Sequence, residues 1–197
     1  MDTSAQSGTP RTAARRLRDC LGHFATGVTV VTVQHGDVVH GATVSAFTSV
    51  SLDPPLVMVS LNRRSRMCER LAGAAFGVNI LATHQRELAL HFAGRHSVPG
   101  ATVNWEKSDQ APRLAGCVAY LDCSPWASHN GGDHVMYVGE VRHLDFGGGE
   151  PLVFHRGAFR ELGRTPDETA WIGSFDCPTD GLWALRASEV LLSARPF

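Results

Sequence analysis

The alternation of apolar and polar side chains in the first third of the chain constrains the fold more than any other feature. Residues 28–33 are all β-branched, which is typical of a strand and unfavourable for a helix. Turn-forming residues follow at 34–37, and a second strand is expected over 38–45, so the two strands form a hairpin. Over 42–52, apolar residues stand mainly at even positions and hydroxyl residues at odd positions, until Asp53-Pro54-Pro55 stops the pairing. The pattern predicts an antiparallel sheet with one apolar face and one hydroxyl-bearing face.

Further strands and a few short helices are expected along the chain. The apolar spacing predicts helices at 12–24, 65–71 and 85–92 and strands at 56–61, 76–81, 117–123, 135–141 and 152–155, with a loop over 124–134. Six or seven mostly antiparallel strands with flanking short helices define a mainly β fold. A closed antiparallel barrel suits such a set, because closure removes exposed edges, and the strand at 152–155 is expected to close the sheet.

The domain organisation follows from length and composition. The 197 residues, of which 43% are hydrophobic, are enough for one domain with a core of its own. We expect a mobile arm over 1–12, the barrel domain over 13–163 and a C-terminal extension over 164–197. The extension contains Trp171, Phe175 and Trp183 and is too apolar for a free linker. We therefore expect it to pack on the barrel or on a second subunit.

Charge and hydropathy argue against two classes of partner. A formal net charge of -1 with interspersed charges gives no basic field for nucleic acid. The longest apolar runs fall far below the roughly 20 residues that span a bilayer, and no apolar stretch follows the N-terminal arginines. We therefore expect a soluble protein with no secretory signal and no membrane partner. Five irregularly spaced cysteines fit reduced thiols, which favours a cytoplasmic location.

The hydroxyl-rich segment is the first candidate for a functional site. A bound phosphate needs several converging donors, and short hydroxyls, backbone N–H groups and arginine supply them. A basic loop over 62–66 stands one strand later, at the start of an expected helix. The same hydroxyl pattern is also typical of the solvent face of an ordinary strand, so both interpretations stay open.

The loop Gly131-Gly132-Asp133-His134 is the second candidate. Its glycines allow the backbone to approach a ligand, and Asp133 can orient the imidazole of His134. A single histidine is more often a satisfied polar residue than a catalytic one. A metal site built from Cys123, His129 and this Asp-His pair lacks recognisable ligand spacing, and no GxSxG motif indicates a nucleophilic serine.

Several segments together resemble a known family. In chain order they are 24–32, 41–55, 56–62, 76–81, 91–94 and 132–134, the last followed by Gly139-Glu140-Val141. They resemble the flavin reductase-like family, whose members are small NAD(P)H:flavin oxidoreductase components of two-component monooxygenases. The resemblance runs from about residue 17 to residue 160. It departs from the family at Ala25, where proline is common, and in the extension after Leu162.

The resemblance implies an FMN-binding split β-barrel of Greek-key type that forms a homodimer. The implied flavin site has three parts. Thr43, Ser45, Ala46 and Phe47 would follow the isoalloxazine and ribityl chain; Ser49, Ser51, Asn62, Arg63 and Ser65 would surround the phosphate; Gly132, Asp133 and His134 would meet the nicotinamide. His134 is the candidate catalytic residue and would position the dinucleotide more than transfer protons.

The resulting hypothesis is an NAD(P)H-dependent flavin reductase. Hydride would pass from NADH or NADPH to N5 of FMN or FAD, and the reduced flavin would go to a partner monooxygenase. The absence of a GxGxxG motif fits a nicotinamide cofactor that binds transiently. Two alternatives are a flavin- or haem-binding split barrel without turnover and a flavoenzyme that acts directly on an organic substrate. The pattern does not separate FMN from FAD or NADH from NADPH.

Overall fold

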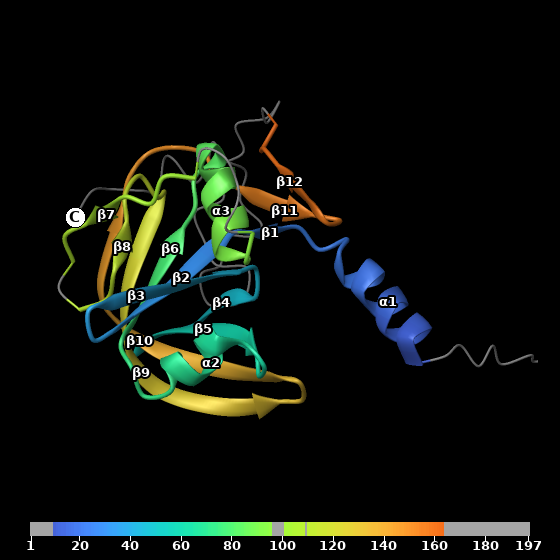
Figure 1. Ribbon diagram of the computed structural model, residues 1–197, viewed down its shortest axis with the longest axis horizontal. Helices are drawn as coiled ribbons and strands as arrows, with labels where there is room; N and C mark the ends of the chain where they lie inside the picture. The colour runs from blue at the N-terminus through green and yellow to red at the C-terminus, as the bar shows by residue number, and fades with distance from the viewer. Residues whose placement is uncertain (1–9, 96–100, 109, 164–197) are drawn as a thin grey trace, which may run out of the picture. The chain divides into compact units, whose positions relative to one another are not determined.

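A computed structural model gives the fold of residues 10–95, 101–108 and 110–163 (Figure 1). The chain divides into two units, Met1–Leu162 and Gly163–Phe197. The expected extension over 164–197 and most of the expected N-terminal arm lie outside the described residues. Within the described part, no helix is long and apolar enough to cross a membrane.

The described residues form short helices and many strands. The helices are α1 (Pro10–Leu21), α2 (Arg66–Leu71), the 3-10 turn η1 (Thr83–Gln85) and α3 (Arg86–Phe92). The strands are β1 (Thr26–Gly27), β2 (Thr29–His35), β3 (Val38–Val44), β4 (Phe47–Leu52), β5 (Pro55–Asn62), β6 (Phe76–Ile80), β7 (Trp105–Glu106), β8 (Arg113–Leu114), β9 (Ala119–Gly131), β10 (His134–Phe146), β11 (Val153–His155) and β12 (Ala158–Arg160).

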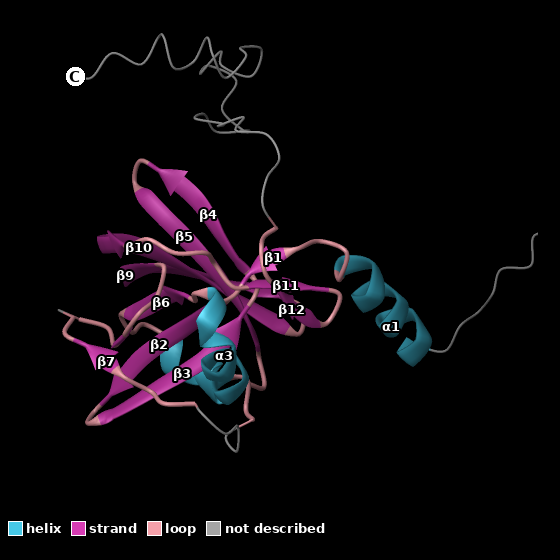
Figure 2. Ribbon diagram, turned by 90° about the horizontal axis from the view of Figure 1, so that it is seen from above, coloured by secondary structure: helices cyan, strands magenta, loops and turns pink. Residues whose placement is uncertain are grey.

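A seven-stranded antiparallel sheet dominates the fold (Figures 1 and 2). Its order is β3-β2-β6-β9-β10-β5-β4, so the two outermost strands, β3 and β4, are consecutive in the chain. Ser45 and Ala46 join them, and the backbone N–H of Ser60 on β5 donates to the carbonyl of Ala46 at 3.0 Å. The mainly β class with short helices is confirmed, while the closure of the sheet into a barrel stays a prediction.

In the described part of the chain, the core consists of two hydrophobic clusters on opposite faces of β2. Side chains alternate along a strand, so Val31 joins one cluster and Val30 the other, and both are fully buried. The first cluster includes Leu71 of α2 and the second includes Ala89 of α3. The continuous β-branched run of β2 therefore reflects burial on both faces, and each helix covers one cluster.

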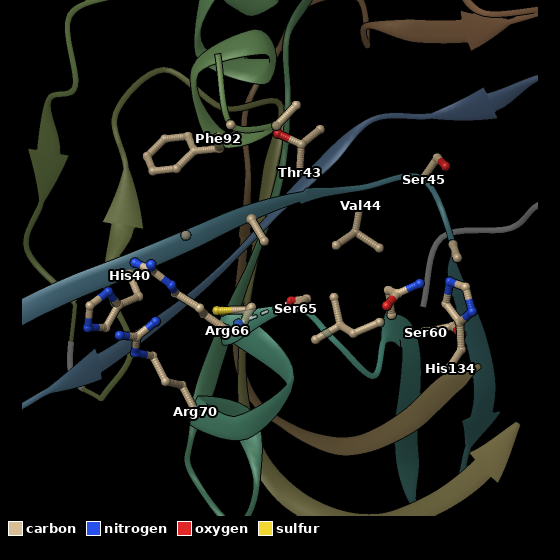
Figure 3. A pocket seen from close by; sticks show the side chains of 18 residues that line it. His40, Thr43, Val44, Ser45, Ser60, Ser65, Arg66, Arg70, Phe92 and His134 are labelled. Carbon is tan, nitrogen blue, oxygen red and sulfur yellow. Dashed lines mark hydrogen bonds between the residues drawn. The ribbon is translucent and has the colours of Figure 1, made fainter. Parts of the chain in front are cut away.

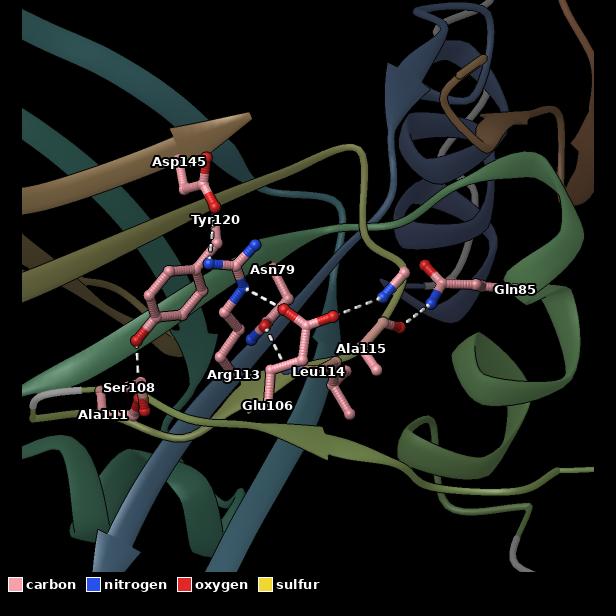
Figure 4. Close-up of polar contacts among 11 residues, drawn as sticks. Asn79, Gln85, Glu106, Ser108, Ala111, Arg113, Leu114, Ala115, Tyr120 and Asp145 are labelled. Atoms are coloured by element: carbon pink, nitrogen blue, oxygen red, sulfur yellow. Dashed lines mark hydrogen bonds and ion pairs between the residues drawn. The ribbon is translucent and has the colours of Figure 1, made fainter. Parts of the chain in front are cut away.

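A buried amide joins the main sheet to the segment that precedes β9 (Figure 4). Asn79 of β6 is completely buried. Its Nδ2 donates to the carbonyl of Val30 at 3.0 Å and to Oγ1 of Thr32 at 3.1 Å. Its Oδ1 accepts from the backbone N–H of Leu114 at 2.7 Å. The next residue continues the connection, because the carbonyl of Ala115 accepts from Gln85 beside α3 at 2.7 Å.

The structure corrects two predictions about strands. The expected loop over 124–134 is mostly strand, because β9 and β10 pair along a long ribbon with a tight turn at Gly132 and Asp133. Pro125 fits in this ribbon because it lies opposite Gly139 at a register shift, where a ladder bond is not required. In addition, β11 does not join the main sheet: it pairs with β1 and β12 in a separate three-stranded sheet.

Candidate functional site

A cavity of about 640 Å³ lies beside the end of β3 (Figure 3). We call it the main cavity. Its walls come from β3, the Ser45–Ala46 corner, the end of β5, α2, the end of α3 and the first residue of β10. The labelled lining residues are His40, Thr43, Val44, Ser45, Ser60, Ser65, Arg66, Arg70, Phe92 and His134.

Three basic side chains gather at one end of the main cavity. Arg66 and Arg70 stand four residues apart on α2 and therefore share one face of the helix. His40 on β3 lies beside them (Figure 3). Burial and the nearby charge of Arg70 lower the pKa of His40. At neutral pH this imidazole is therefore neutral, while both guanidiniums are charged. Among the described residues neither arginine forms an ion pair, so this end of the cavity attracts an anion.

The wall on the side of α3 combines an aromatic ring with backbone and hydroxyl groups. A Cβ atom at Gly41 would stand 2.6 Å from the ring of Phe92, so glycine at this position lets the ring pack on β3. The hydroxyl of Thr43 donates to the carbonyl of Ala89 in α3 at 2.6 Å. Thr43 therefore fastens α3 to β3, although it also lines the cavity.

The turn between β9 and β10 presents His134 at the edge of the main cavity. Its Nδ1 lies 2.7 Å from Oδ1 of Asp133. The hydrogen bond from His134 lowers the pKa of Asp133 below its usual range, so the carboxylate is ionised at neutral pH and can only accept. The proton between the two groups is therefore on Nδ1, which leaves Nε2 free to meet a ligand.

Arg63 supports this turn from the neighbouring strand. Its backbone N–H donates to the carbonyl of Asp133 at 2.9 Å. Its guanidinium donates to Oδ1 of Asn130 at 2.9 Å and reaches the carbonyl of His134 at 3.4 Å. Arg63 does not line the main cavity; it holds the segment that carries His134.

The structure gathers some of the expected site residues and separates others. The main cavity brings together six of them, namely Thr43, Ser45, Ala46, Asn62, Ser65 and His134. Gly132 and Asp133 form the turn before His134. Outside the lining are Phe47, Ser49, Ser51 and Arg63; Phe47 packs against the first core cluster, and Ser49 and Ser51 lie on β4. The functional roles of all these residues stay predictions.

Sequence reasoning missed several lining residues. These are His40, Ser60, Arg70 and Phe92, whereas Arg66 belongs to the basic loop over 62–66 that the sequence indicated. A signal was present for Arg70, because its four-residue spacing from Arg66 predicts a shared helix face. His40, Ser60 and Phe92 carry no such signal, since only tertiary packing turns them toward the same space.

Comparison with known proteins identifies the class of protein to which this fold and cavity belong. A family model described as "Flavin reductase like domain" matches residues 21–163. An NADH-dependent flavin reductase from Rhodococcus sp is 42% identical over 167 residues, which cover 82% of this chain and 94% of the relative. The reductase component of a 4-nitrophenol 4-monooxygenase/4-nitrocatechol 2-monooxygenase from Rhodococcus opacus is 41% identical over 144 residues, with coverage of 73% and 78%.

A solved structure with the same fold leads to the same class. The NADH:FAD oxidoreductase of Streptomyces globisporus C-1027, in complex with NAD and FAD fragments, superimposes with a TM-score of 0.74 at 36% identity. That alignment covers 82% of this chain and 99% of the other. The class is that of flavin-reducing oxidoreductases. This chain belongs to the flavin reductase-like family, which confirms the predicted family, reaction class and use of flavin with a nicotinamide cofactor.

Proposed function

We propose that this chain binds its flavin in the main cavity and delivers the reduced flavin to a separate monooxygenase. The observation that carries the proposal is the arrangement of the cavity, which has two arginines at one end and an oriented histidine at its edge. A relative of this size works as the reductase component of a nitrophenol monooxygenase, which supports a partner oxygenase.

The residues around the main cavity fit a phosphorylated flavin. Arg66 and Arg70 offer a doubly charged surface for a phosphate, and arginine binds phosphate through paired N–H donors. Ser45, Ser60 and His134 lie at the end of the cavity away from the arginines, and Val44 lies between the two ends (Figure 3). The lining thus has guanidiniums at one end and hydroxyl groups with an imidazole at the other, which fits a ligand with one anionic end and one polar ring.

The residues of the chain act mainly by placing the two reactants. When bound, the flavin supplies the redox chemistry by accepting a hydride at N5. Arg66 and Arg70 would anchor the phosphate, while His134 would orient the nicotinamide through Nε2. Asp133 keeps the proton on Nδ1, and Arg63 keeps the turn in place. Holding both reactants in one site makes the encounter effectively intramolecular, so no acid or base residue is required.

A homodimer and a cytoplasmic location are further parts of the proposal. Val50 and Leu52 on the outermost strand β4 are apolar, and their exposed fractions are 51% and 90%. Apolar side chains on an outermost strand favour contact with a second subunit. Reduced thiols, expected from the cysteine spacing, favour the cytoplasm.

Anaerobic stopped-flow absorbance tests the proposal directly. The protein is mixed with FMN or FAD and then with NADH or NADPH, and bleaching of the visible flavin band is followed. We expect rapid bleaching. The bleaching rates of the four combinations show which flavin and which nicotinamide cofactor the protein prefers. A protein that binds flavin but shows no bleaching with either nicotinamide would contradict the proposal.

Variants of two histidines test the role of the turn. His134→Ala is expected to slow bleaching and to raise the KM for the nicotinamide, while the Kd for flavin stays unchanged. His129→Ala is the matched control. His129 is exposed on the same ribbon, but it lies outside the turn and does not line the main cavity. Loss of flavin binding in His134→Ala with unchanged nicotinamide kinetics would show that the assignment of this turn is wrong.

A further inference from the structure

The ring of Phe92 forms part of the wall of the main cavity and contacts two other elements (Figure 3). Phe92 is the last residue of α3 and is half-buried. Its ring packs against the backbone of β3 at Gly41, where a Cβ atom would stand 2.6 Å away. The same ring contacts the indole of Trp105 edge to face, with ring centroids 6.3 Å apart. The position of this part of the wall therefore depends on a residue of β7.

Trp105 itself lies outside the main cavity. It begins β7 and is not among the residues that line the cavity. Its exposed fraction is 41%, and it belongs to neither of the two core clusters. A side chain that is this exposed contributes less hydrophobic stabilisation than a core side chain. The contact with Phe92 therefore points to a role for this indole in the wall of the cavity rather than in the core.

The strand that carries Trp105 is fastened to the main sheet (Figure 4). In the pair of β7 and β8, Glu106 lies opposite Arg113. The guanidinium of Arg113 forms ion pairs with Glu106 at 2.9 Å and with Asp145 of β10 at 2.7 Å. The buried amide of β6 described above bonds to the backbone of β8 as well. Two strands of the main sheet thus hold the β7–β8 pair, which gives the indole a fixed support.

We propose that Trp105 is a positioning residue for flavin binding, because its indole keeps the Phe92 ring in the place that the bound flavin requires. The proposal rests on the proposed function, which places the flavin in the main cavity. Without the indole the ring gains freedom, and only a fraction of the molecules has this part of the wall in place. The apparent Kd for flavin then rises by the reciprocal of that fraction. Since Trp105 lies outside the cavity, the hydride transfer that follows binding changes little.

Flavin binding by variants of Trp105 tests the proposal. The Kd for FMN is measured on the full chain from the change in flavin fluorescence, and KM and kcat are measured with the preferred nicotinamide cofactor. Loss of the edge-to-face contact in Trp105→Ala is expected to raise the Kd and the KM for FMN about three- to tenfold, while kcat changes less than about twofold. Trp105→Phe keeps an aromatic ring and should restore both constants to within about twofold of the wild type. Trp126→Ala is the matched control, because Trp126 is 54% exposed and does not line the main cavity.

A double-mutant cycle shows whether Trp105 acts through Phe92. Phe92→Ala removes the ring, and a double variant, Phe92→Ala with Trp105→Ala, removes both side chains. If the indole acts by holding the ring, Trp105→Ala should change the Kd for FMN less than about twofold once the ring is absent. A general structural loss would instead add to the effect of Phe92→Ala. An unchanged Kd in Trp105→Ala, an equal loss in Trp105→Phe or Trp126→Ala, or additive losses in the double variant would overturn the proposal.

Two further measurements keep the outcomes separate. Thermal unfolding of each variant checks that the fold is intact, and Trp105→Leu replaces Trp105→Ala if the latter unfolds. Arg66→Gln tests the location of the flavin independently, because Arg66 lines the main cavity from α2. If Arg66→Gln weakens FMN binding and Trp105→Ala does not, the flavin site stands and the positioning role is refuted. If Arg66→Gln and Phe92→Ala both leave the Kd for FMN unchanged, the flavin lies elsewhere, so the proposed function fails and the positioning role falls with it.

Discussion

Replacement of Asn79 by leucine is expected to lower the free energy of unfolding substantially. Asn79 is completely buried, and its side chain makes three hydrogen bonds, to Val30, Thr32 and Leu114. Leucine has a similar size, so the change removes polar partners with little effect on packing volume. The backbone N–H of Leu114 then has no acceptor in a buried position.

The magnitude follows from these three bonds. An orphaned buried donor costs about 1–3 kcal/mol, and each of the two remaining bonds contributes about 0.5–1.5 kcal/mol. The expected loss is therefore about 2–6 kcal/mol. Since each kcal/mol shifts the midpoint of thermal unfolding by about 2–4 °C in a chain of this size, a loss of about 3 kcal/mol lowers the midpoint by about 6–12 °C.

Urea unfolding measures this loss, with a second amide as control. The midpoint of unfolding is compared for the wild type, Asn79→Leu and Asn104→Leu, because Asn104 is exposed. We expect a large shift for Asn79→Leu and a small one for Asn104→Leu, with similar slopes. Equal midpoints for the two variants would refute the reasoning, because they would show that the buried amide does not join the sheet to the segment at Leu114.

Three more outcomes are expected. Gly139→Ala places a Cβ 2.5 Å from Cζ of Phe76, and this overpacking should lower the urea midpoint by the equivalent of about 1–3 kcal/mol; an unchanged midpoint would show that the ring moves freely. Thr43→Val removes the hydrogen bond from the threonine hydroxyl to the carbonyl of Ala89, but this carbonyl still accepts from the backbone N–H of Ala93. The free energy of unfolding, measured by thermal unfolding, should therefore fall by about 0.5–1.5 kcal/mol. The depressed pKa of Asp133 means that its contact with the adjacent imidazole persists above that pKa and is lost as the pH falls through it. NMR titration of the carboxyl should give a midpoint below 3.8 that rises when the imidazole is removed; a midpoint at or above 3.8 in the wild type would contradict this.

The early strands could be predicted because local sequence and tertiary burial agree there. Residues 29–33 of β2 are β-branched at every position, and the structure buries both faces of this part of the strand, with Val30 in one cluster and Val31 in the other. Burial on both faces removes the need for polar alternation, so an uninterrupted apolar and β-branched run is the expected pattern. The hairpin to β3 follows from turn residues that the chain itself contains.

The long ribbon of β9 and β10 could not be predicted from local composition. Residues 124–131 include Ser124, Pro125 and Gly131, which favour loops, and most of their side chains are exposed. They form a strand because β10 pairs with them in register over most of its length. Pairing with β10, the strand that follows directly after the turn, outweighs the local preference of these residues for a loop. The irregular positions of the ladder accommodate the proline.

The hydroxyl pattern indicated one continuous strand where the structure has two, β3 and β4. The odd positions from Thr43 to Ser51 look like one face of one strand. The chain instead turns at Ser45 and Ala46, and β3 and β4 are the two outermost strands of the main sheet. A register shift between Ser49 and Ser51 breaks the parity again. Only the residues before and at the corner line the main cavity, because the alternation does not reveal where one strand ends.

The placement of the arginines shows why the position of a charged residue near a motif is a weak guide to the role of that residue. Arg63 and Arg66 stand three residues apart and look equivalent in the sequence, yet Arg63 turns to the β9–β10 turn and Arg66 to the main cavity. The difference arises where β5 ends and α2 begins. Burial of Leu71 in the first core cluster fixes the rotation of α2, and this rotation sends Arg66 and Arg70 into the cavity.

The same principle holds on the other side of β3. Burial of Ala89 in the second cluster fixes the rotation of α3, which leaves Arg86 facing a second cavity of about 700 Å³ between α3 and the hairpin of β11 and β12. Apolar packing on the two faces of β2 therefore determines which cations face each cavity. A substitution that changes the packing of one helix should alter ligand affinity in the cavity beside that helix more than in the other, because each set of charges rests on its own hydrophobic cluster.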